Sequence, residues 1–301
     1  MLAEDIIVCE NLVKIYKTKD LEVLALQGLD LAIEAGELMA IIGNSGSGKS
    51  TFLNMIGGLD RPSAGKLTVD GKDLFKLNER QLVEYKRNTV GFVWQNNARN
   101  LIPYLSALQN IQLPMVFDDG RKRRERALEL LELVGMSHKK NNRLNQLSGG
   151  EQQRIAIAIA LANNPKILLA DEPTGAVDVK TGNYILDVFR ELNKNLGLTV
   201  VIVTHDRQLS KKVNRVVSIR DGKTSSEMIM KQSYAAAMEN VGAFTDAQEQ
   251  TIMETHNEFA ILDRAGRVQI PKEMLANIGV KGNKVRFEVE DGKIIIAPPE
   301  E

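Results

Sequence analysis

Three short segments of the chain hold residues that could bind a nucleotide phosphate and promote its cleavage. They are GNSGSGKST at Gly43–Thr51, LSGGEQQR at Leu147–Arg154 and ILLADEP at Ile167–Pro173, and His205 follows them after a hydrophobic stretch. Glycines let main-chain amides turn toward an anion, lysine supplies positive charge, and paired acids can bind a metal ion or activate water. Residues of these types in this order indicate phosphate chemistry.

The first segment matches the phosphate-loop pattern GxxxxGK[ST] and follows the apolar stretch Leu38–Ile42, as that motif requires. Lys49 is expected to reach the β- and γ-phosphates of a nucleotide, and Ser50 to bind Mg²⁺. A glycine-rich turn without a ligand is the alternative. The expected nucleotide-binding residues are Gly43, Asn44, Ser45, Gly46, Ser47, Gly48, Lys49, Ser50 and Thr51.

Two acids, Asp171 and Glu172, end a hydrophobic strand expected at Ile167–Ala170. The carboxyl end of a buried parallel strand lies at the sheet edge where phosphates bind. We expect Asp171 to hold Mg²⁺ and Glu172 to orient and deprotonate the attacking water. The alternative is a pair of solvated acids at a strand end.

The segment LSGGEQQR, named the signature segment below, contains Ser148, Gly149 and Gly150 directly before a predicted helix. Their amides and hydroxyl therefore form a second predicted anion site at a helix N-terminus. The phosphate loop of the same chain is not expected to use this site.

The elements that must position these residues alternate between strand and helix, which predicts an α/β fold. Asp221-Gly222 is a turn signal that closes the last of these strands. The expected strands are Ile6–Leu12, Gly28–Ile33, Leu38–Ile42, Lys66–Val69, Val90–Trp94, Ile167–Ala170, Thr199–Val203 and Arg215–Arg220, and the expected helices are Thr51–Gly57, Arg121–Val134 and Thr181–Asn195.

With these motifs, Leu2–Lys223 resembles the nucleotide-binding subunit of an ABC transporter. EPTGAVD, NLIPYLSALQNI and LSGGEQQRIAIAIALANNP are most similar to the MacB/LolD/FtsE group. The resemblance implies a P-loop NTPase with a RecA-like core, an antiparallel β-subdomain and an α-helical subdomain. It also implies an ATP-hydrolysing subunit that drives export or extraction of peptides, lipoproteins or drugs through a separate permease. Ile159, Val177 and a longer segment after Gln95 depart from the usual pattern.

The resemblance also implies roles for individual residues. Gln95 matches the glutamine that senses Mg²⁺ and the attacking water and contacts the permease, while Asp178 matches the aspartate that crosses the dimer interface. His205 matches the switch histidine at the γ-phosphate, and Tyr16 the aromatic that stacks on adenine. In this family two subunits pack head to tail, so the resemblance implies a homodimer. A plain core tyrosine is the alternative for Tyr16, and an incidental histidine for His205.

The end of the chain has a different character, and we divide the sequence into an ATPase domain at 1–225, a partly helical linker at 226–257 and a small domain at 258–301. Within the last part we expect strands at Phe259–Leu262 and Val268–Ile270, a helix from Pro271 to Gly279, and a hairpin around Asp291-Gly292. This segment resembles the swapped-hairpin domain of AbrB/SpoVT-type regulators, which implies dimerisation. A unit of about 40 residues also buries too little core to stand alone.

Two other functions stay open. If Arg264, Arg267 and Lys272 share one face of such a dimer they could bind DNA, although Phe259–Glu301 holds as many acidic as basic residues. The second alternative is a non-transport ABC ATPase that acts through a membrane partner, as in the FtsE-like proteins.

Composition is consistent with a cytoplasmic protein held at the inner face of the membrane by its permease. The 39 basic and 39 acidic residues balance, so attraction to nucleic acid or lipid would need a local patch. RKRRER before Ala127 is interpreted as a solvated helix face, with phospholipid contact as the alternative. The single Cys9 suits a reducing compartment, and no apolar run approaches the roughly 18 residues that span a bilayer.

Overall fold

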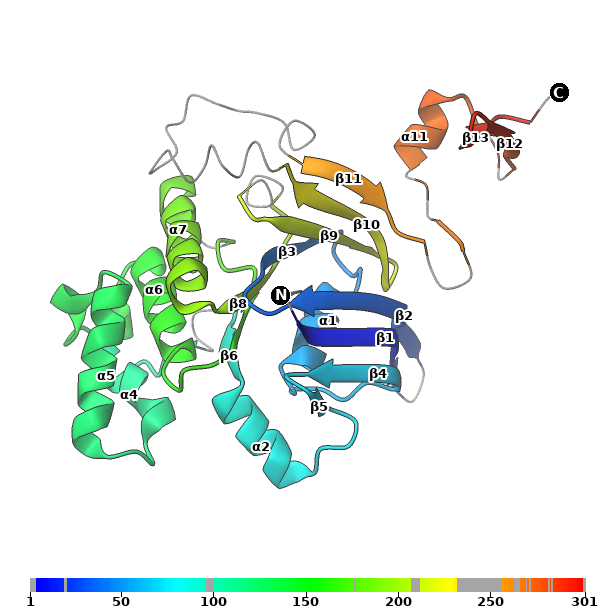
Figure 1. Ribbon diagram of the computed structural model, residues 1–301. Helices are drawn as coiled ribbons and strands as arrows, with labels where there is room; N and C mark the ends of the chain where they lie inside the picture. Colours follow the sequence, from blue (N-terminus) through cyan, green and yellow to red (C-terminus); the bar gives the residue numbers. More distant parts are fainter. Residues whose placement is uncertain are drawn as a thin grey trace. The chain divides into compact units, whose positions relative to one another are not determined.

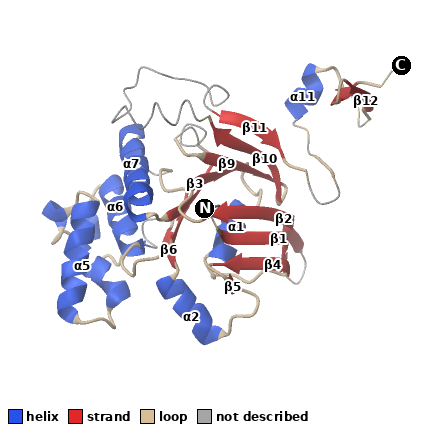
Figure 2. Cartoon of the chain, viewed as in Figure 1, coloured by secondary structure: helices blue, strands red, loops and turns tan. Residues whose placement is uncertain are grey.

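The computed structural model divides the chain into two units, Met1–Phe259 and Ala260–Glu301, which are considered separately. Figure 1 traces both in sequence colours, and Figure 2 shows their helices and strands. The structure describes residues 4–18, 21–95, 100–175, 177–206, 212–231, 256–262, 266–268, 270, 272–280, 282 and 284–299.

A mostly parallel sheet forms the centre of the first unit. β3 pairs in parallel with β8 and β9, and β7 with β6 and β8, whereas β10 runs antiparallel to β9. In the described part of the chain the strand order is β11-β10-β9-β3-β8-β7-β6. The strands are β3 Leu38–Ile42, β6 Val90–Val93, β7 Ile167–Asp171, β8 Thr199–Thr204, β9 Arg215–Arg220, β10 Lys223–Met230 and β11 His256–Ala260.

The inner strands β3, β7 and β8 are apolar over most of their length because both faces of the sheet are covered. In β7, Leu168 and Ala170 belong to one hydrophobic cluster, while Ile167 and Leu169 belong to another. Successive strand side chains point to opposite faces, so an uninterrupted apolar run fills two cores at once. This arrangement confirms the α/β class and fixes the carboxyl end of β7 at the sheet edge.

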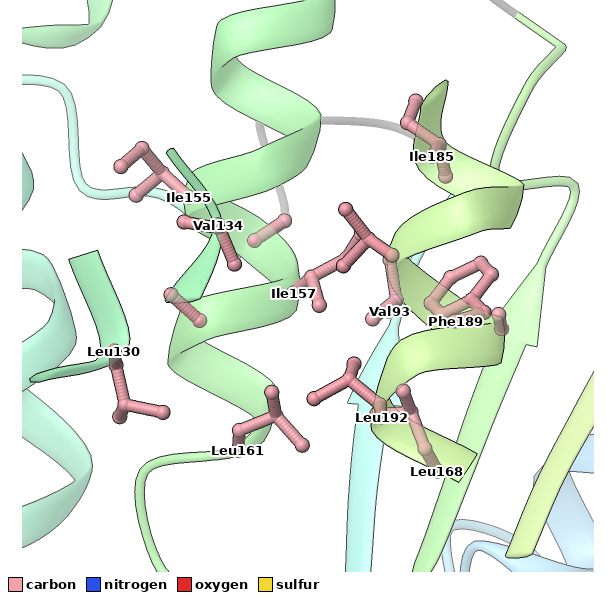
Figure 3. Packing of buried hydrophobic residues seen from close by; sticks show 14 of the residues in the cluster. Val93, Leu130, Val134, Ile155, Ile157, Leu161, Leu168, Ile185, Phe189 and Leu192 are labelled. Carbon is pink, nitrogen blue, oxygen red and sulfur yellow. The ribbon is translucent and has the colours of Figure 1, made fainter. Parts of the chain in front are cut away.

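Helices cover the first of these clusters (Figure 1). Ser148 and Asp178 begin α6 and α7 as N-caps that accept hydrogen bonds from main-chain amides. Figure 3 shows side chains of α6 and α7 meeting above β6 and β7. The helices of this unit are α1 Lys49–Ile56, α2 Glu79–Asn88, α4 Ala107–Gln112, α5 Gly120–Leu133, α6 Gly149–Ala160 and α7 Val179–Leu196, with 3-10 turns at Leu113–Met115, Ser137–Lys139 and Leu144–Gln146.

A second, antiparallel sheet lies against the other cluster, which also receives α1. Its strands are β1 Asp5–Lys17, β2 Glu22–Glu34, β4 Ala64–Val69 and β5 Lys72–Asp73, in the order β2-β1-β4-β5. β1 and β2 are longer than predicted, and their register places Tyr16 opposite Val23. The Tyr16–Val23 end of the β1–β2 ribbon lies in the same cavity lining as the phosphate loop.

The structure differs from the predicted linker at both of its ends. Asp221 and Gly222 have φ of 50° and 71°, so the turn sends the chain back as β10 instead of ending the sheet. A register shift between Thr224 and Ser226 breaks the alternation of β10 and hides it from the sequence pattern. β11 then adds to the same sheet. Residues 232–255 of the predicted linker lie outside the described residues.

The second unit contains α11 Lys272–Asn277 and an antiparallel hairpin of β12 Arg286–Glu290 and β13 Lys293–Ala297. The predicted strand at Phe259–Leu262 differs, because its first two residues belong to β11 and Leu262 bridges Val268. Phe287, Val289 and Ile294 are 64%, 79% and 72% exposed. Among the described residues, no helix has the length and apolarity to cross a bilayer.

Candidate active site

The phosphate loop connects β3 to α1, and Gly48 is the residue that begins the helix. Its φ of 102° lies in the left-handed region, and a Cβ there would come within 2.6 Å of the Ala25 carbonyl oxygen. Only glycine fits both demands without strain. The loop amides can therefore turn toward the N-terminus of α1, where the helix dipole favours an anion.

Lys49 lies at the first position of α1 and is buried against the loop. Its Nζ donates to the main-chain oxygens of Gly43, at 2.8 Å, and Asn44, at 2.9 Å. Burial lowers the pKa of this amino group, while the negative charges of Glu172 and Asp171 oppose that shift. The cation is thus positioned between the phosphate loop and the two acids.

Ser50 meets the end of β7, as the sequence predicted for a metal site. Its hydroxyl donates to Asp171 Oδ1 at 3.1 Å, so two oxygen donors from distant segments lie together. Hydroxyl and carboxylate oxygens suit Mg²⁺, which is a hard cation with few protein ligands. These two residues therefore fit the predicted ion.

Glu172 follows β7 in a strained conformation, with φ of 48°. A bond from its amide to the Val203 carbonyl oxygen, at 2.8 Å, holds the main chain. Its carboxylate contacts His205 Nδ1 through Oε1 at 2.8 Å and accepts from the Thr204 hydroxyl through Oε2 at 3.3 Å. The side chain is 12% exposed, so two groups at the end of β8 hold a nearly buried carboxylate.

Lys49, Ser50, Glu172 and His205 line a cavity of about 940 Å³, which also receives Tyr16 and Gln95, while Asp171 is not among its lining residues but is bonded to Ser50. Sequence reasoning missed part of its lining, namely Val23, Leu24 and Ala25 from β2 and Ser218, Ile219, Arg220 and Asp221 from the end of β9. The Asp221-Gly222 turn was found, but only the structure shows that the Gly222 amide donates to the Ser47 carbonyl oxygen at 3.0 Å. That bond holds the turn against the phosphate loop.

The signature residues do not line this cavity. Ser148 caps α6, where its hydroxyl accepts from the Glu151 amide at 3.3 Å, and Asp178 caps α7, accepting from the Thr181 amide at 3.0 Å. The two helix starts touch, because a Cβ on Gly150 would lie 2.2 Å from Thr181 Cγ2. Ser148, Gly149, Gly150 and Asp178 thus form a separate group of residues.

The sequence of the first unit matches a known protein family. A model described as ABC transporter matches residues 26–175. An ABC transporter ATP-binding protein from Thermotoga maritima is 47% identical over 212 residues, which cover 70% of this chain and 89% of that protein. The chain belongs to the ABC transporter family. Like its homologues, this ABC protein is an ATP-binding and ATP-hydrolysing subunit.

Two further relatives are informative. The ABC protein MJ0796 from Methanocaldococcus jannaschii is 45% identical over 224 residues, or 72% of this chain and 94% of that one. Its dimer, bound to ADP and phosphate, aligns with a TM-score of 0.68 at 44% identity and covers 73% of this chain and 97% of that one. The macrolide export protein MacB from Rhodopirellula baltica is 45% identical over 224 residues, which cover 73% of this chain but 32% of MacB.

Proposed function

We propose that this ABC subunit drives export or extraction, with the residues of the cavity carrying out ATP hydrolysis. The observation that carries the proposal is the meeting of Lys49, Ser50 and the Glu172–His205 pair in one cavity, with Asp171 bonded to Ser50. The groups for phosphate binding, metal binding and water activation therefore lie close together.

Each group has a proposed task. Lys49 and the loop amides bind the phosphates, and Ser50, Asp171 and Gln95 hold Mg²⁺, which when bound would neutralise phosphate charge. Glu172 takes a proton from the attacking water, and its contact with His205 fixes the direction of the carboxylate. Tyr16 packs against the nucleobase.

The signature residues are proposed to serve a second copy of the chain. Ser148, Gly149 and Gly150 lie outside the cavity, yet they present main-chain amides at the start of α6. MJ0796 has been solved as a dimer with ADP and phosphate, which supports a head-to-tail pair here. Asp178, at the start of α7, would then lie at the subunit interface.

Export is proposed from the similarity to MacB, whose name states macrolide export and a permease part. This chain covers about a third of MacB. The permease is proposed to be another chain that holds this subunit at the inner face, as the resemblance to ABC transporter subunits implies. The transported molecule is then selected by that permease. An FtsE-like, non-transport role is the second candidate.

Reconstitution tests this choice. The chain, placed in liposomes with a membrane protein that co-purifies with it, should drive accumulation of a peptide, lipoprotein or drug substrate only with ATP. The Glu172→Gln variant should abolish that accumulation. ATP hydrolysis that the membrane protein stimulates, with no movement of any of these substrates, would favour the non-transport role.

Ala260–Glu301 is proposed to be an AbrB-like unit that holds two chains together. Three apolar side chains of its hairpin, Phe287, Val289 and Ile294, are mostly exposed, which supports a partner surface. Phe287→Asp should lower nucleotide-free dimerisation in sedimentation experiments, whereas Lys293→Gln, an exposed polar change in the same hairpin, should not. Unchanged dimerisation of Phe287→Asp would count against the clamp.

DNA binding by this unit is the other candidate for it. Of the three basic residues predicted to act together, Arg264 lies outside the described residues and the Lys272 side chain is not described, while Arg267 is exposed. A salt-sensitive gel shift at micromolar protein would support DNA binding, and its absence would exclude it.

A further inference from the structure

Tyr16 belongs to a polar cluster at the rim of the cavity. Its hydroxyl donates to Asp60 Oδ2 at 2.7 Å, and Lys14 Nζ donates to Asp60 Oδ1 at 2.6 Å. Lys14 Nζ also donates to the Arg61 carbonyl oxygen at 2.8 Å and lies over the Tyr16 ring, 4.7 Å from its centroid. One carboxylate therefore binds both the hydroxyl of the ring and the cation on its face.

The local structure explains why these three residues meet. Lys14 and Tyr16 are two positions apart in β1, so their side chains share one face of the sheet. Asp60 follows α1, and the next residues run along β1, where the Ser63 amide donates to the Val13 carbonyl oxygen at 2.8 Å. The Ile15 amide in turn donates to the Ser63 hydroxyl at 3.0 Å. The segment after α1 is thus bonded beside the cation and the ring.

The pKa shifts of Asp60 and Tyr16 favour the protonation states that their hydrogen bond requires. Burial acts to raise the pKa of Asp60, but hydrogen bonds from Lys14 and Tyr16 outweigh it and hold that pKa below its ordinary value. Burial and the bond to Asp60 raise the pKa of Tyr16, although a hydrogen bond with Thr51 opposes them. A charged carboxylate and a protonated hydroxyl therefore face each other at neutral pH.

We propose that Asp60 and Lys14 are positioning residues that hold the Tyr16 ring for stacking on the nucleobase of ATP. Lys14 covers one face of the ring, and the ring lines the cavity and is 38% exposed, so the base stacks on the opposite face. A ring anchored at its hydroxyl loses little conformational freedom when the base arrives. The proposal rests on the role proposed above for Tyr16.

The test compares two ligands that share the phosphates and differ in the base. Affinities of the full-length chain for ATP and for inorganic triphosphate are measured by calorimetry with Mg²⁺ present. Tyr16→Ala should weaken ATP binding about tenfold and leave triphosphate binding unchanged, because base stacking alone is lost. Asp60→Ala and Lys14→Met should each weaken ATP binding roughly threefold, also without an effect on triphosphate.

A double-substitution cycle separates positioning from general stability. Tyr16→Phe keeps the ring and removes the anchor, so adding Asp60→Ala to it should cost much less ATP affinity than Asp60→Ala alone. The KM for ATP should rise in these variants while kcat at saturating ATP stays within about twofold. Lys14→Arg, which keeps the cation, should restore most of the affinity.

Lys66→Met is the matched control. Lys66 forms an ion pair with Glu10, at 3.3 Å, between strands of the same sheet but does not line the cavity, so both affinities should be unchanged. If Tyr16→Ala weakens ATP alone but Asp60→Ala, Lys14→Met and Tyr16→Phe do not, the positioning role is overturned and the base contact stands. If Tyr16→Ala does not change the ratio of ATP affinity to triphosphate affinity, Tyr16 does not contact the base, and the positioning proposal fails with that contact.

Discussion

The phosphate-loop region and the signature region contain comparable anion-binding features but differ in how they are completed. Around Lys49, side chains that follow β3, β7 and β8 converge, and Lys49, Asp171 and Glu172 each have a hydrogen-bond partner. Around Ser148, the start of α6 lies outside that cavity and meets the start of α7. The first region is built by the fold of one chain, whereas we propose that the second is completed by a second chain.

The largest effect is expected for Glu172→Gln, which keeps the shape of the side chain but removes the base. ATP turnover should fall at least about a hundredfold, because general-base catalysis contributes that much or more. ATP affinity should stay near the wild-type value, since Lys49 and the loop are unchanged. Steady-state phosphate release and equilibrium binding measure the two quantities, and wild-type turnover in this variant would refute the assignment of the base.

Mixing two inactive variants tests whether the phosphate-loop region of one chain acts with the signature region of another. Lys49→Ala damages only the phosphate-loop region and Ser148→Arg only the signature region, so each should be nearly inactive alone. If the site is shared between two chains, a mixture should regain activity, up to about a quarter of wild type when pairing is random. The assay is ATP turnover against mixing ratio; a mixture as inactive as its components would contradict a shared site.

A smaller effect is expected where the two helix starts meet. Gly150→Ala would place a Cβ 2.2 Å from Thr181 Cγ2, so we expect it to destabilise the chain by about 1–3 kcal/mol in urea unfolding. Thr181→Ser removes that methyl group and keeps the hydroxyl that donates to Asp178. The double variant should recover part of the loss, and equal stability of single and double variants would show that the contact is not the cause.

The smallest effect concerns pH. Burial lowers the pKa of Lys49, so its positive charge is lost at a lower pH than the roughly 10.4 of an ordinary lysine. ATP affinity should therefore weaken as pH rises, and the midpoint of this loss should lie below the pKa of an ordinary lysine. Ser148→Ala should show the same profile because it leaves Lys49 and the phosphate loop unchanged. A profile that stays flat up to pH 10.4 would argue against direct phosphate binding by Lys49.

Much of the ATPase unit could be predicted because its motifs are local. β3 and β9 have the predicted bounds, and Gly48 begins α1 as a phosphate loop requires. β10 was missed because a register shift interrupts its alternation, and β11 was predicted only at Phe259 and Ala260 and not as part of this sheet, because an added edge strand is held mainly by main-chain pairing. Side-chain pattern carries little information about such pairing.

The amino-acid sequence alone determined the phosphate loop, the two acids after β7 and the identity of the signature residues, since each depends on residue type over a few positions. Tertiary structure decided that Ser50 meets Asp171, that His205 holds Glu172 and that Asp60 anchors Tyr16, because these pairs lie far apart along the chain. It also left Ser148 outside the cavity. Such proximity arises from strand order and helix packing, which local residue patterns do not encode.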